Sequence, residues 1–137
     1  MRLWHKDLLP VLPRQQLLGQ WRECVLIARQ IKEKGTPNHI LVNKVTEYPI
    51  SHLYAYGLFI LGIAAGRGYH IDFGRFKKYF DESDYIGKCP TADKVFEGWH
   101  NNRYMIQCLC NLQEKYDCGA IPADEWEKIV EKYPAWR

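Results

Sequence analysis

The chain has 137 residues, of which 47% are hydrophobic and 14% aromatic, and its formal net charge is +3. This composition excludes intrinsic disorder, and the length favours a single domain over residues 1–137. The most apolar run, 53–65, is too short to span a bilayer, and charged residues near the start exclude a secretory signal. We therefore expect a soluble, cytoplasmic protein with no membrane partner. A monomer is a separate expectation that the composition does not decide.

The positive charge is concentrated in one part of the sequence. Residues 1–80 hold 12 Lys and Arg against 5 Asp and Glu, whereas residues 81–137 hold 7 against 11. The two parts therefore carry +7 and −4, which add up to the net charge of +3. A basic surface of this kind can bind a polyanion such as a nucleic acid.

Residues 1–12 are predicted to form a non-helical lead, because two nearby prolines favour an extended backbone. Leu3 and Trp4 are apolar, and we expect them to dock this lead against the helical core. The α-amino group of Met1 would then be held in place. With a reference pKa of about 7.7–8.0, an α-amine is partly unprotonated near neutral pH. The alternative is a frayed terminus, the usual state of chain ends.

A long amphipathic helix is predicted from Pro13 to Gly35. Its apolar residues recur at three- and four-residue intervals, as one buried helix face requires. Proline suits the first turn of a helix, and glycine suits its C-terminal end. The buried stripe is predicted to include Leu17, Trp21, Cys24, Ala28 and Ile31.

Glu23 lies outside this stripe, about 140° from its centre at 100° per residue. Gly19 is one turn earlier on the same face, and a glycine inside a helix costs roughly 1 kcal/mol relative to alanine. Because helical side chains lean toward the N-terminus, the Glu23 carboxylate is predicted to lie over Gly19, beside open space. Two interpretations stay open: a functional carboxylate beside a pocket, or a solvated glutamate on the helix exterior.

The middle of the sequence predicts one buried helix and one basic segment. Residues 36–48, which include Lys44, look irregular, and a helix over 50–65 is apolar nearly all round, as in a central helix. Residues 69–84 hold a short amphipathic segment, and residues 81–90 form a loop. The segment's inner face is predicted to hold Phe73, Phe76 and Phe80, while Arg75, Lys77 and Lys78 point outward, either toward phosphates or into solvent.

Two further helices are predicted in the C-terminal part. Thr91 is a suitable N-cap for a third long helix over 92–116, which has a polar patch at 100–103. A short helix covers 122–133. The sequence thus predicts an all-α fold of three main helices plus short ones.

The five cysteines form no recognisable disulfide or zinc pattern. Cys108 and Cys110 lie about 200° apart on a helix, so they cannot both face one metal ion. We expect reduced, mostly buried thiols, and neither a metal nor another cofactor.

Motifs of several common enzyme classes are absent. The sequence has no serine nucleophile elbow, no phosphate-cradling glycine loop and no dinucleotide fingerprint. What remains is an N-terminal amine, one helix-borne glutamate and nearby arginines. Such a set suits metal-free chemistry in which a neutral amine forms a Schiff base and a carboxylate transfers protons.

Three segments resemble the pyrimidine-dimer DNA glycosylase family, the endonuclease V enzymes first known from a bacteriophage, and its bacterial branch in particular. They are the start Met1-Arg2-Leu3, the helix segment 17–23 (Leu-Leu-Gly-Gln-Trp-Arg-Glu) and the helix end 65–71 (Ala-Gly-Arg-Gly-Tyr-His-Ile). The resemblance extends over roughly the first half of the chain.

This resemblance implies a DNA repair glycosylase with abasic-site lyase activity. In the family the N-terminal amine attacks the deoxyribose C1′ and expels the base, and a glutamate of the first helix is the acid/base; the matching groups here are the amine of Met1 and Glu23. The resulting imine permits β-elimination, which nicks the strand. Arg2 and Arg22 match arginines that hold backbone phosphates. The implied partner is double-stranded DNA with pyrimidine dimers, related base lesions or abasic sites, so we expect the protein to be associated with the nucleoid when it binds DNA.

Three features depart from the phage enzyme. That enzyme loses its initiator methionine and uses a threonine amine, whereas here the large Arg2 is expected to protect Met1 from removal. Leu26 stands where the phage enzyme has a basic residue, so one phosphate contact is expected to be weaker. The aromatic C-terminal tail is reduced to Tyr133 and Trp136.

The sequence therefore predicts Met1 and Glu23 as the catalytic groups, with Gly19 in the pocket. The predicted DNA-binding residues are Arg2, Arg22, Lys44, Arg75, Lys77 and Lys78. The alternative is a non-catalytic helical module that binds nucleic acid or another protein.

Overall fold

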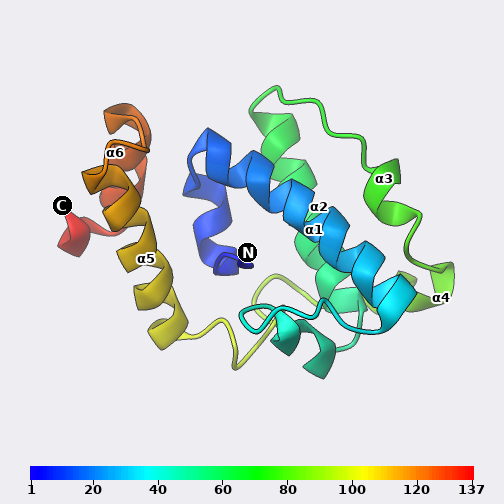
Figure 1. The fold of residues 1–137 in the computed structure, drawn as a ribbon. Helices are drawn as coiled ribbons and strands as arrows, with labels where there is room; N and C mark the ends of the chain where they lie inside the picture. The colour runs from blue at the N-terminus through cyan, green and yellow to red at the C-terminus, as the bar shows by residue number, and fades with distance from the viewer.

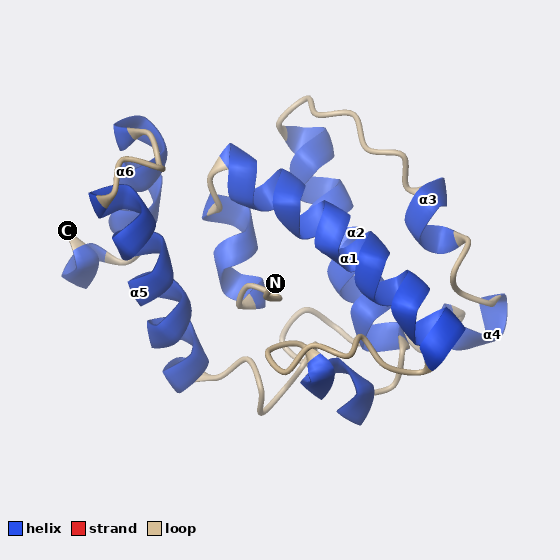
Figure 2. Cartoon of the chain, in the orientation of Figure 1, coloured by secondary structure: helices blue, strands red, loops and turns tan.

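The computed structural model describes residues 1–137 and is built from helices without any strand (Figures 1 and 2). The prediction of an all-α fold is confirmed. Three helices are long: α1 (Arg14–Lys34), α2 (Ser51–Gly66) and α5 (Asn102–Asp117). The shorter elements are α3 (Gly74–Lys77), α4 (Glu82–Tyr85) and α6 (Ala123–Lys132), and the 3₁₀-helices η1 (Lys6–Val11), η2 (Asn43–Glu47) and η3 (Pro134–Trp136).

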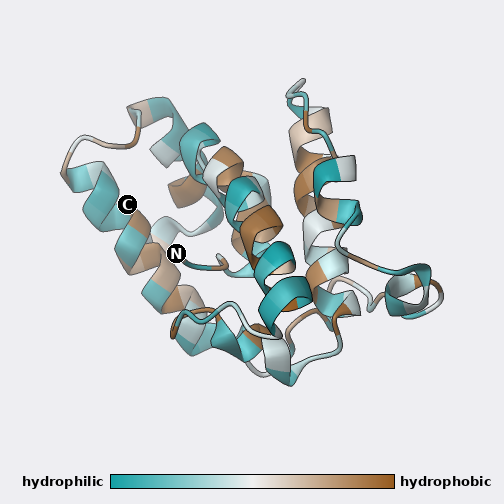
Figure 3. Ribbon diagram, turned by 45° about the vertical axis from the view of Figure 1, so that its right-hand side comes forward, coloured by the Kyte–Doolittle hydropathy of each residue, from teal (hydrophilic) through white to brown (hydrophobic).

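One hydrophobic core joins these elements. The buried apolar residues form a single cluster that draws on the N-terminal segment and on α1, α2, α5 and α6. In Figure 3, brown hydrophobic residues recur along the long helices between teal hydrophilic ones, as amphipathic helices require. None of the helices is long and apolar enough to cross a membrane.

Helix α1 has nearly the predicted bounds. Gly35 ends it in the left-handed conformation (φ 79°), which glycine adopts without strain, and its N–H donates to the Ile31 carbonyl at 2.8 Å. The predicted stripe is buried except for Ile31, which is half-buried. Two more residues of α1, Gln20 and Ile27, are also buried. The polar side chain of Gln20 therefore lies inside the core.

Helix α2 is the central helix that its composition predicts. It packs against α1 and η1, and most of its residues are buried or half-buried. Gly57 allows one close contact, because a Cβ at this position would lie 2.5 Å from the ring of the fully buried Phe76. Through this contact α3 lies close to α2, and α3 also packs against α1.

The N-terminal segment is docked on the core, as predicted, although its second half is the helix η1 and not extended chain. Leu3 and Trp4 are buried. Arg67, which follows α2, donates from Nη1 to the Leu12 carbonyl at 2.8 Å and from Nη2 to the Pro10 carbonyl at 2.9 Å. These bonds fix the end of η1 to the end of α2.

The predicted helix over 92–116 is wrong in its first ten residues. Residues 92–101 form turns and bends, and α5 begins only at Asn102. Phe96 and Gly98 have φ angles of 52° and 89°, which an α-helix cannot contain.

Side chains hold this irregular segment in place. His52 Nδ1 accepts the N–H of Phe96 at 3.0 Å, and the Tyr48 hydroxyl donates to the Glu97 carbonyl at 2.6 Å. Asn101, and not Thr91, is the N-cap of α5, and its side chain accepts the N–H of Tyr104 at 2.9 Å. The predicted polar patch at 100–103 therefore lies at the start of a helix and not in its middle.

Two smaller expectations also change. The predicted loop at 81–90 contains the single turn α4, which begins with a capping box at Asp81 and Asp84. The expectation of mostly buried thiols is wrong, because only two of the five free cysteines, Cys24 and Cys108, are buried. The final helix α6 lies inside its predicted range.

Candidate active site

The N-terminal segment and α1 bring two of the predicted groups close together. The backbone N–H of Arg2 donates to Oε2 of Glu23 at 3.3 Å. This nitrogen lies one residue after the α-amine, and backbone dimensions separate the two nitrogens by about 3–3.7 Å. The Met1 amine therefore lies within about 7 Å of the Glu23 carboxylate. The ion pairs of the chain do not include it, so the two groups are near each other without direct contact.

Gln20 connects the same two elements from inside the core. Its Nε2 donates to the Arg2 carbonyl at 2.8 Å and to Glu23 Oε2 at 3.2 Å. Its Oε1 accepts the N–H of Trp4 at 2.6 Å and lies 2.9 Å from the Tyr56 hydroxyl. The amide thus uses both its donors and its acceptor to fix the N-terminal segment relative to the Glu23 carboxylate.

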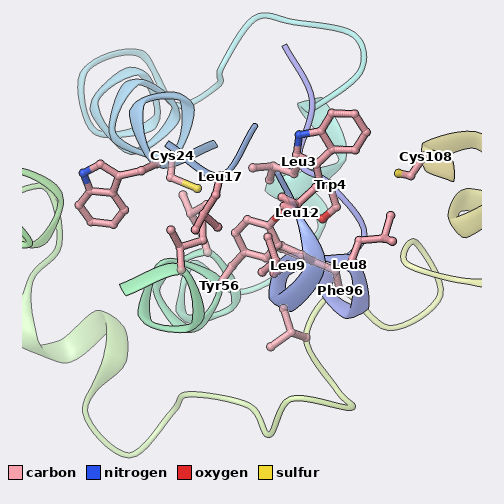
Figure 4. Close-up of a cluster of buried hydrophobic side chains, with 14 of the residues drawn as sticks. Leu3, Trp4, Leu8, Leu9, Leu12, Leu17, Cys24, Tyr56, Phe96 and Cys108 are labelled. Atoms are coloured by element: carbon pink, nitrogen blue, oxygen red, sulfur yellow. Dashed lines mark hydrogen bonds between the residues drawn. The ribbon is translucent and has the colours of Figure 1, made fainter. Parts of the chain in front are cut away.

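Two tyrosine hydroxyls donate hydrogen bonds to the carbonyl groups of Leu3 and Trp4, the two residues after Arg2. The Tyr104 hydroxyl donates to the Leu3 carbonyl at 2.5 Å, and the Tyr56 hydroxyl donates to the Trp4 carbonyl at 2.6 Å. Burial raises the pKa of both tyrosines above the usual value, so both stay neutral donors near neutral pH. Figure 4 shows Leu3 and Trp4 among the leucines of η1, close to Tyr56.

Arg2 lies against α5. Its guanidinium carbon lies 5.6 Å from the centroid of the Trp4 ring and 5.9 Å from that of the Tyr104 ring, both within cation–π range. Its Nη1 also donates to Cys108 Sγ at 3.8 Å. The half-buried side chain of Arg2 therefore helps to hold the N-terminal segment on α5.

A groove between α1 and α3 gathers three arginines. It has a volume of about 270 Å³, and Arg22, Arg29 and Arg75 line it together with Trp21, Val25 and Leu26. The groove has no acidic residue, and none of the three guanidinium groups takes part in an ion pair. Free, planar guanidinium groups suit phosphate oxygens. We call this the arginine groove.

The remaining predicted DNA-binding residues lie outside the arginine groove. Lys77 and Lys78 are exposed in and just after α3, and Lys78 Nζ lies 5.2 Å from the centroid of the Tyr79 ring. Lys44 is exposed on η2. The structure thus brings Arg22 and Arg75 together and leaves these lysines at separate positions.

The expectation for Gly19 needs a correction. A Cβ at Gly19 would have one neighbour within 4 Å, the Nη2 atom of Arg22 at 3.8 Å. The Glu23 carboxylate does not lie there, because its hydrogen bonds turn it toward Gln20 and Arg2. Open space does lie beside Gly19, but its neighbour is the guanidinium of Arg22.

A buried histidine of the N-terminal segment, His5, lies against a second buried histidine, His100. The rings of His5 and His100 stack with their centroids 5.2 Å apart, and His100 Nδ1 accepts the N–H of Lys6 at 3.0 Å. Burial lowers the pKa of His100 to about 2 and also lowers that of His5. Both rings are therefore neutral near pH 7. No group of three or more His, Cys, Asp or Glu side chains is placed to hold a metal ion.

Sequence reasoning missed four contributors to these sites: Gln20, Tyr56, Tyr104 and Arg29. A signal for Gln20 was present, because it is a polar residue inside the apolar stripe of α1, where a buried amide needs hydrogen-bond partners. Arg29 follows Arg22 at a spacing of two helical turns, which places both on one face. No local pattern identifies Tyr56, since its role depends on the tertiary packing of α2 against the N-terminal segment.

Comparison with known proteins gives one match. No curated protein and no solved structure matches the chain. The family model of pyrimidine dimer DNA glycosylase matches residues 1–76 of the 137, which is more than half of the chain. The matched part contains the docked N-terminus, Gln20, Glu23 and the arginine groove. The chain therefore belongs to the pyrimidine dimer DNA glycosylase family.

Proposed function

We propose that the protein is a DNA glycosylase that is also an abasic-site lyase, with the Met1 α-amine as nucleophile and Glu23 as the group that transfers protons. The observation that carries this proposal is the hydrogen bond from the Arg2 N–H to Glu23 Oε2, one residue from the amine. It supports a site in which a reacting carbon can fit between an amine and a carboxylate.

The proposed reaction has two parts, and its electrons balance without a redox partner. The neutral amine forms a bond to C1′ of the damaged nucleotide, and the glycosidic bond breaks so that the base leaves with the bonding pair. The sugar ring then opens to a protonated imine. The carboxylate removes a C2′ proton, a C2′–C3′ double bond forms, and the 3′-phosphate leaves with the electron pair of the C3′–O bond, which nicks the strand. Water finally hydrolyses the imine to regenerate the amine.

The arginine groove supports this assignment from a different part of the surface. Extraction of a nucleotide from the stack costs a few kcal/mol of unstacking free energy, and contacts to backbone phosphates offset this cost. The groove lies on α1, the helix that also carries Glu23, so phosphates bound there would orient the duplex relative to the site.

Borohydride trapping tests the proposal. With abasic-site DNA, we expect a covalent protein–DNA adduct that peptide mapping assigns to Met1. Acetylation restricted to the α-amine should abolish the adduct. A matched control carries two residues added before Met1, which keeps an α-amine but moves it away from Glu23, and its trapping should fall strongly. Retardation of DNA without any adduct would instead identify a non-catalytic binding module.

We further propose that the substrates are pyrimidine dimers in double-stranded DNA, that no metal is needed, and that the protein acts as a monomer of one domain. Incision of irradiated duplex DNA in excess EDTA tests the first two points. Incision in EDTA is expected, and incision only after a divalent metal is added would contradict it.

A further inference from the structure

The loop between α1 and η2 presents two aliphatic side chains to solvent. Ile40 is 86% exposed and Leu41 is 51% exposed. Burying aliphatic side chains is favourable, so a partner that covers both would gain free energy that the protein alone does not.

This tip is held rigidly. The N–H of His39 donates to Asn43 Oδ1 at 2.8 Å, and the N–H of Val42 donates back to the His39 carbonyl at 3.0 Å. The N–H of Leu41 donates to His39 Nδ1 at 3.3 Å. Val42 itself is fully buried and anchors the turn in the core. The two exposed side chains are therefore displayed by a fixed turn.

The tip also lies close to the candidate active site. In Figure 1 the cyan loop after α1 turns just below the N-terminus, and in Figure 4 the same loop arches over the end of the chain that carries Leu3 and Trp4. The chain continues from this tip to Lys44, which is exposed on η2. Two apolar side chains followed within three residues by an exposed lysine suit a partner with apolar faces and a charged backbone.

We propose that the tip formed by Ile40 and Leu41 is a wedge that enters the base stack of duplex DNA next to the damaged nucleotide; this rests on the proposed function. Aliphatic side chains inserted between base steps unstack them and kink the duplex. The base faces take up the apolar side chains, while the exposed Lys44 contacts a backbone phosphate. The wedge stabilises the opened stack from which a nucleotide is presented to the amine and carboxylate.

A duplex fits this tip better than a protein partner does. A specific protein interface buries about 800 Å² on each side, which two side chains on a narrow turn do not supply. A base step offers a gap that one or two aliphatic side chains fill.

The experiment measures unstacking separately from chemistry. A duplex carries 2-aminopurine beside an abasic site, and its fluorescence rises when the base loses its neighbours. With the wild-type protein we expect a rise of several-fold. The double variant Ile40→Ala/Leu41→Ala should lose most of that rise and should cleave the duplex at least tenfold more slowly. Ile40→Phe keeps an apolar wedge and should retain both.

Controls separate the wedge from the chemistry. Ile86→Ala removes another exposed aliphatic side chain (61% exposed) far along the chain and should behave as wild type. Borohydride trapping on single-stranded abasic DNA, which needs no unstacking, should stay within about twofold of wild type in the double variant.

The outcomes are decisive in both directions. The wedge proposal is contradicted if the double variant unstacks and cleaves duplex DNA like wild type. It is also contradicted if the wild-type protein causes no rise in fluorescence. An equal loss of trapping on single strands would also overturn it, because the defect would then lie in the site. A wild-type fluorescence rise that the double variant lacks, with no adduct from either protein, supports the wedge and contradicts the Schiff-base mechanism instead.

Discussion

Neighbouring faces of α1 use their polar groups in opposite ways. On one face Gln20 and Glu23 are tied to the N-terminal segment by direct hydrogen bonds. On the other, Arg22 and Arg29 line a groove and form no ion pair, although Arg22 is next to Glu23 in the sequence. Reacting groups need fixed positions, and satisfied hydrogen bonds supply them. A surface that binds a polyanion gains from donors that are still free. Each prediction below probes one of the two faces.

The largest effect is expected at Glu23 on the fixed face. Glu23→Gln keeps the shape of the side chain but removes its capacity to take up a proton, so the cleavage rate should fall by about 10²-fold or more. Affinity for abasic duplex DNA should change little. Glu33→Gln, an exposed position on the same helix, is the matched control and should cleave normally. An unchanged cleavage rate in Glu23→Gln would remove Glu23 from the mechanism.

Gln20→Met should produce the next largest effect. It keeps the volume but removes bonds to the Arg2 and Trp4 backbone, so cleavage should slow by about tenfold, and unfolding free energy should fall by about 1–3 kcal/mol. DNA affinity should stay close to wild type, which distinguishes lost positioning from lost binding. Gln16→Met is the control, because the Gln16 Oε1 atom is buried without a partner and loses no bond. Equal slowing in both variants would contradict a positioning role for Gln20.

The N-terminal segment that docks on the fixed face should make the fold sensitive to acid, because the buried His100 accepts the N–H of Lys6 in this segment. The pKa of His100 is lowered to about 2 in the folded chain, against about 6.5 when unfolded. The unfolded state therefore binds the proton first, and stability should fall by about 1.4 kcal/mol per pH unit as the pH drops below about 6.5.

Urea titrations between pH 7 and pH 4 measure this slope. His100→Gln should have a shallower slope than wild type, whatever its stability at pH 7. His70→Gln changes an exposed histidine and should leave the slope unaltered. A wild-type slope in His100→Gln would show that other groups govern the acid sensitivity.

A smaller effect is expected in the arginine groove. Arg29→Ala should weaken DNA binding several-fold at low salt and lower the magnitude of the slope of log affinity against log salt by about 0.9. Cleavage at saturating enzyme should be unaffected. The control is Arg14→Ala, whose guanidinium lies over the Tyr69 ring outside the groove. If Arg29→Ala alters the saturating rate and not the salt slope, the division between the two faces fails.

The smallest effect belongs to Gly19. Alanine at this position meets no atom closer than 3.8 Å, so Gly19→Ala should raise the unfolding free energy by up to about 1 kcal/mol through helix propensity. Gly19→Leu should weaken DNA binding by crowding the Arg22 guanidinium. Thermal melts and DNA titrations of the two variants test this pair, and normal DNA binding by Gly19→Leu would mean that the space is not used.

Sequence patterns were most informative where interactions are local. The periodicity of α1 and α2 and the glycine at 35 gave helix bounds within one residue. The start of the third helix was predicted ten residues too early because of a tertiary contact. His52 accepts the N–H of Phe96, and Phe96 has a positive φ that no α-helix contains.

The site was predictable only in part, because several of its contacts also depend on tertiary packing. The resemblance and the docked apolar residues at 3 and 4 pointed to the N-terminus and Glu23. The Gln20 network, however, depends on Tyr56, which is 36 residues away in sequence. Likewise Arg75 joins Arg22 only because Gly57 lets Phe76 approach α2.

The bond from Tyr104 to the Leu3 carbonyl has a consequence for protein synthesis. It joins residues 101 positions apart, and Tyr104 lies beyond the stretch that the family model matches. A nascent chain that has just left the ribosome with residues 1–76 already contains both proposed reacting groups. Its N-terminus nevertheless lacks the hydroxyl that secures it until α5 has emerged and folded. We therefore expect the proposed strand cleavage to require a chain that extends through α5, so that shorter nascent chains would not nick DNA.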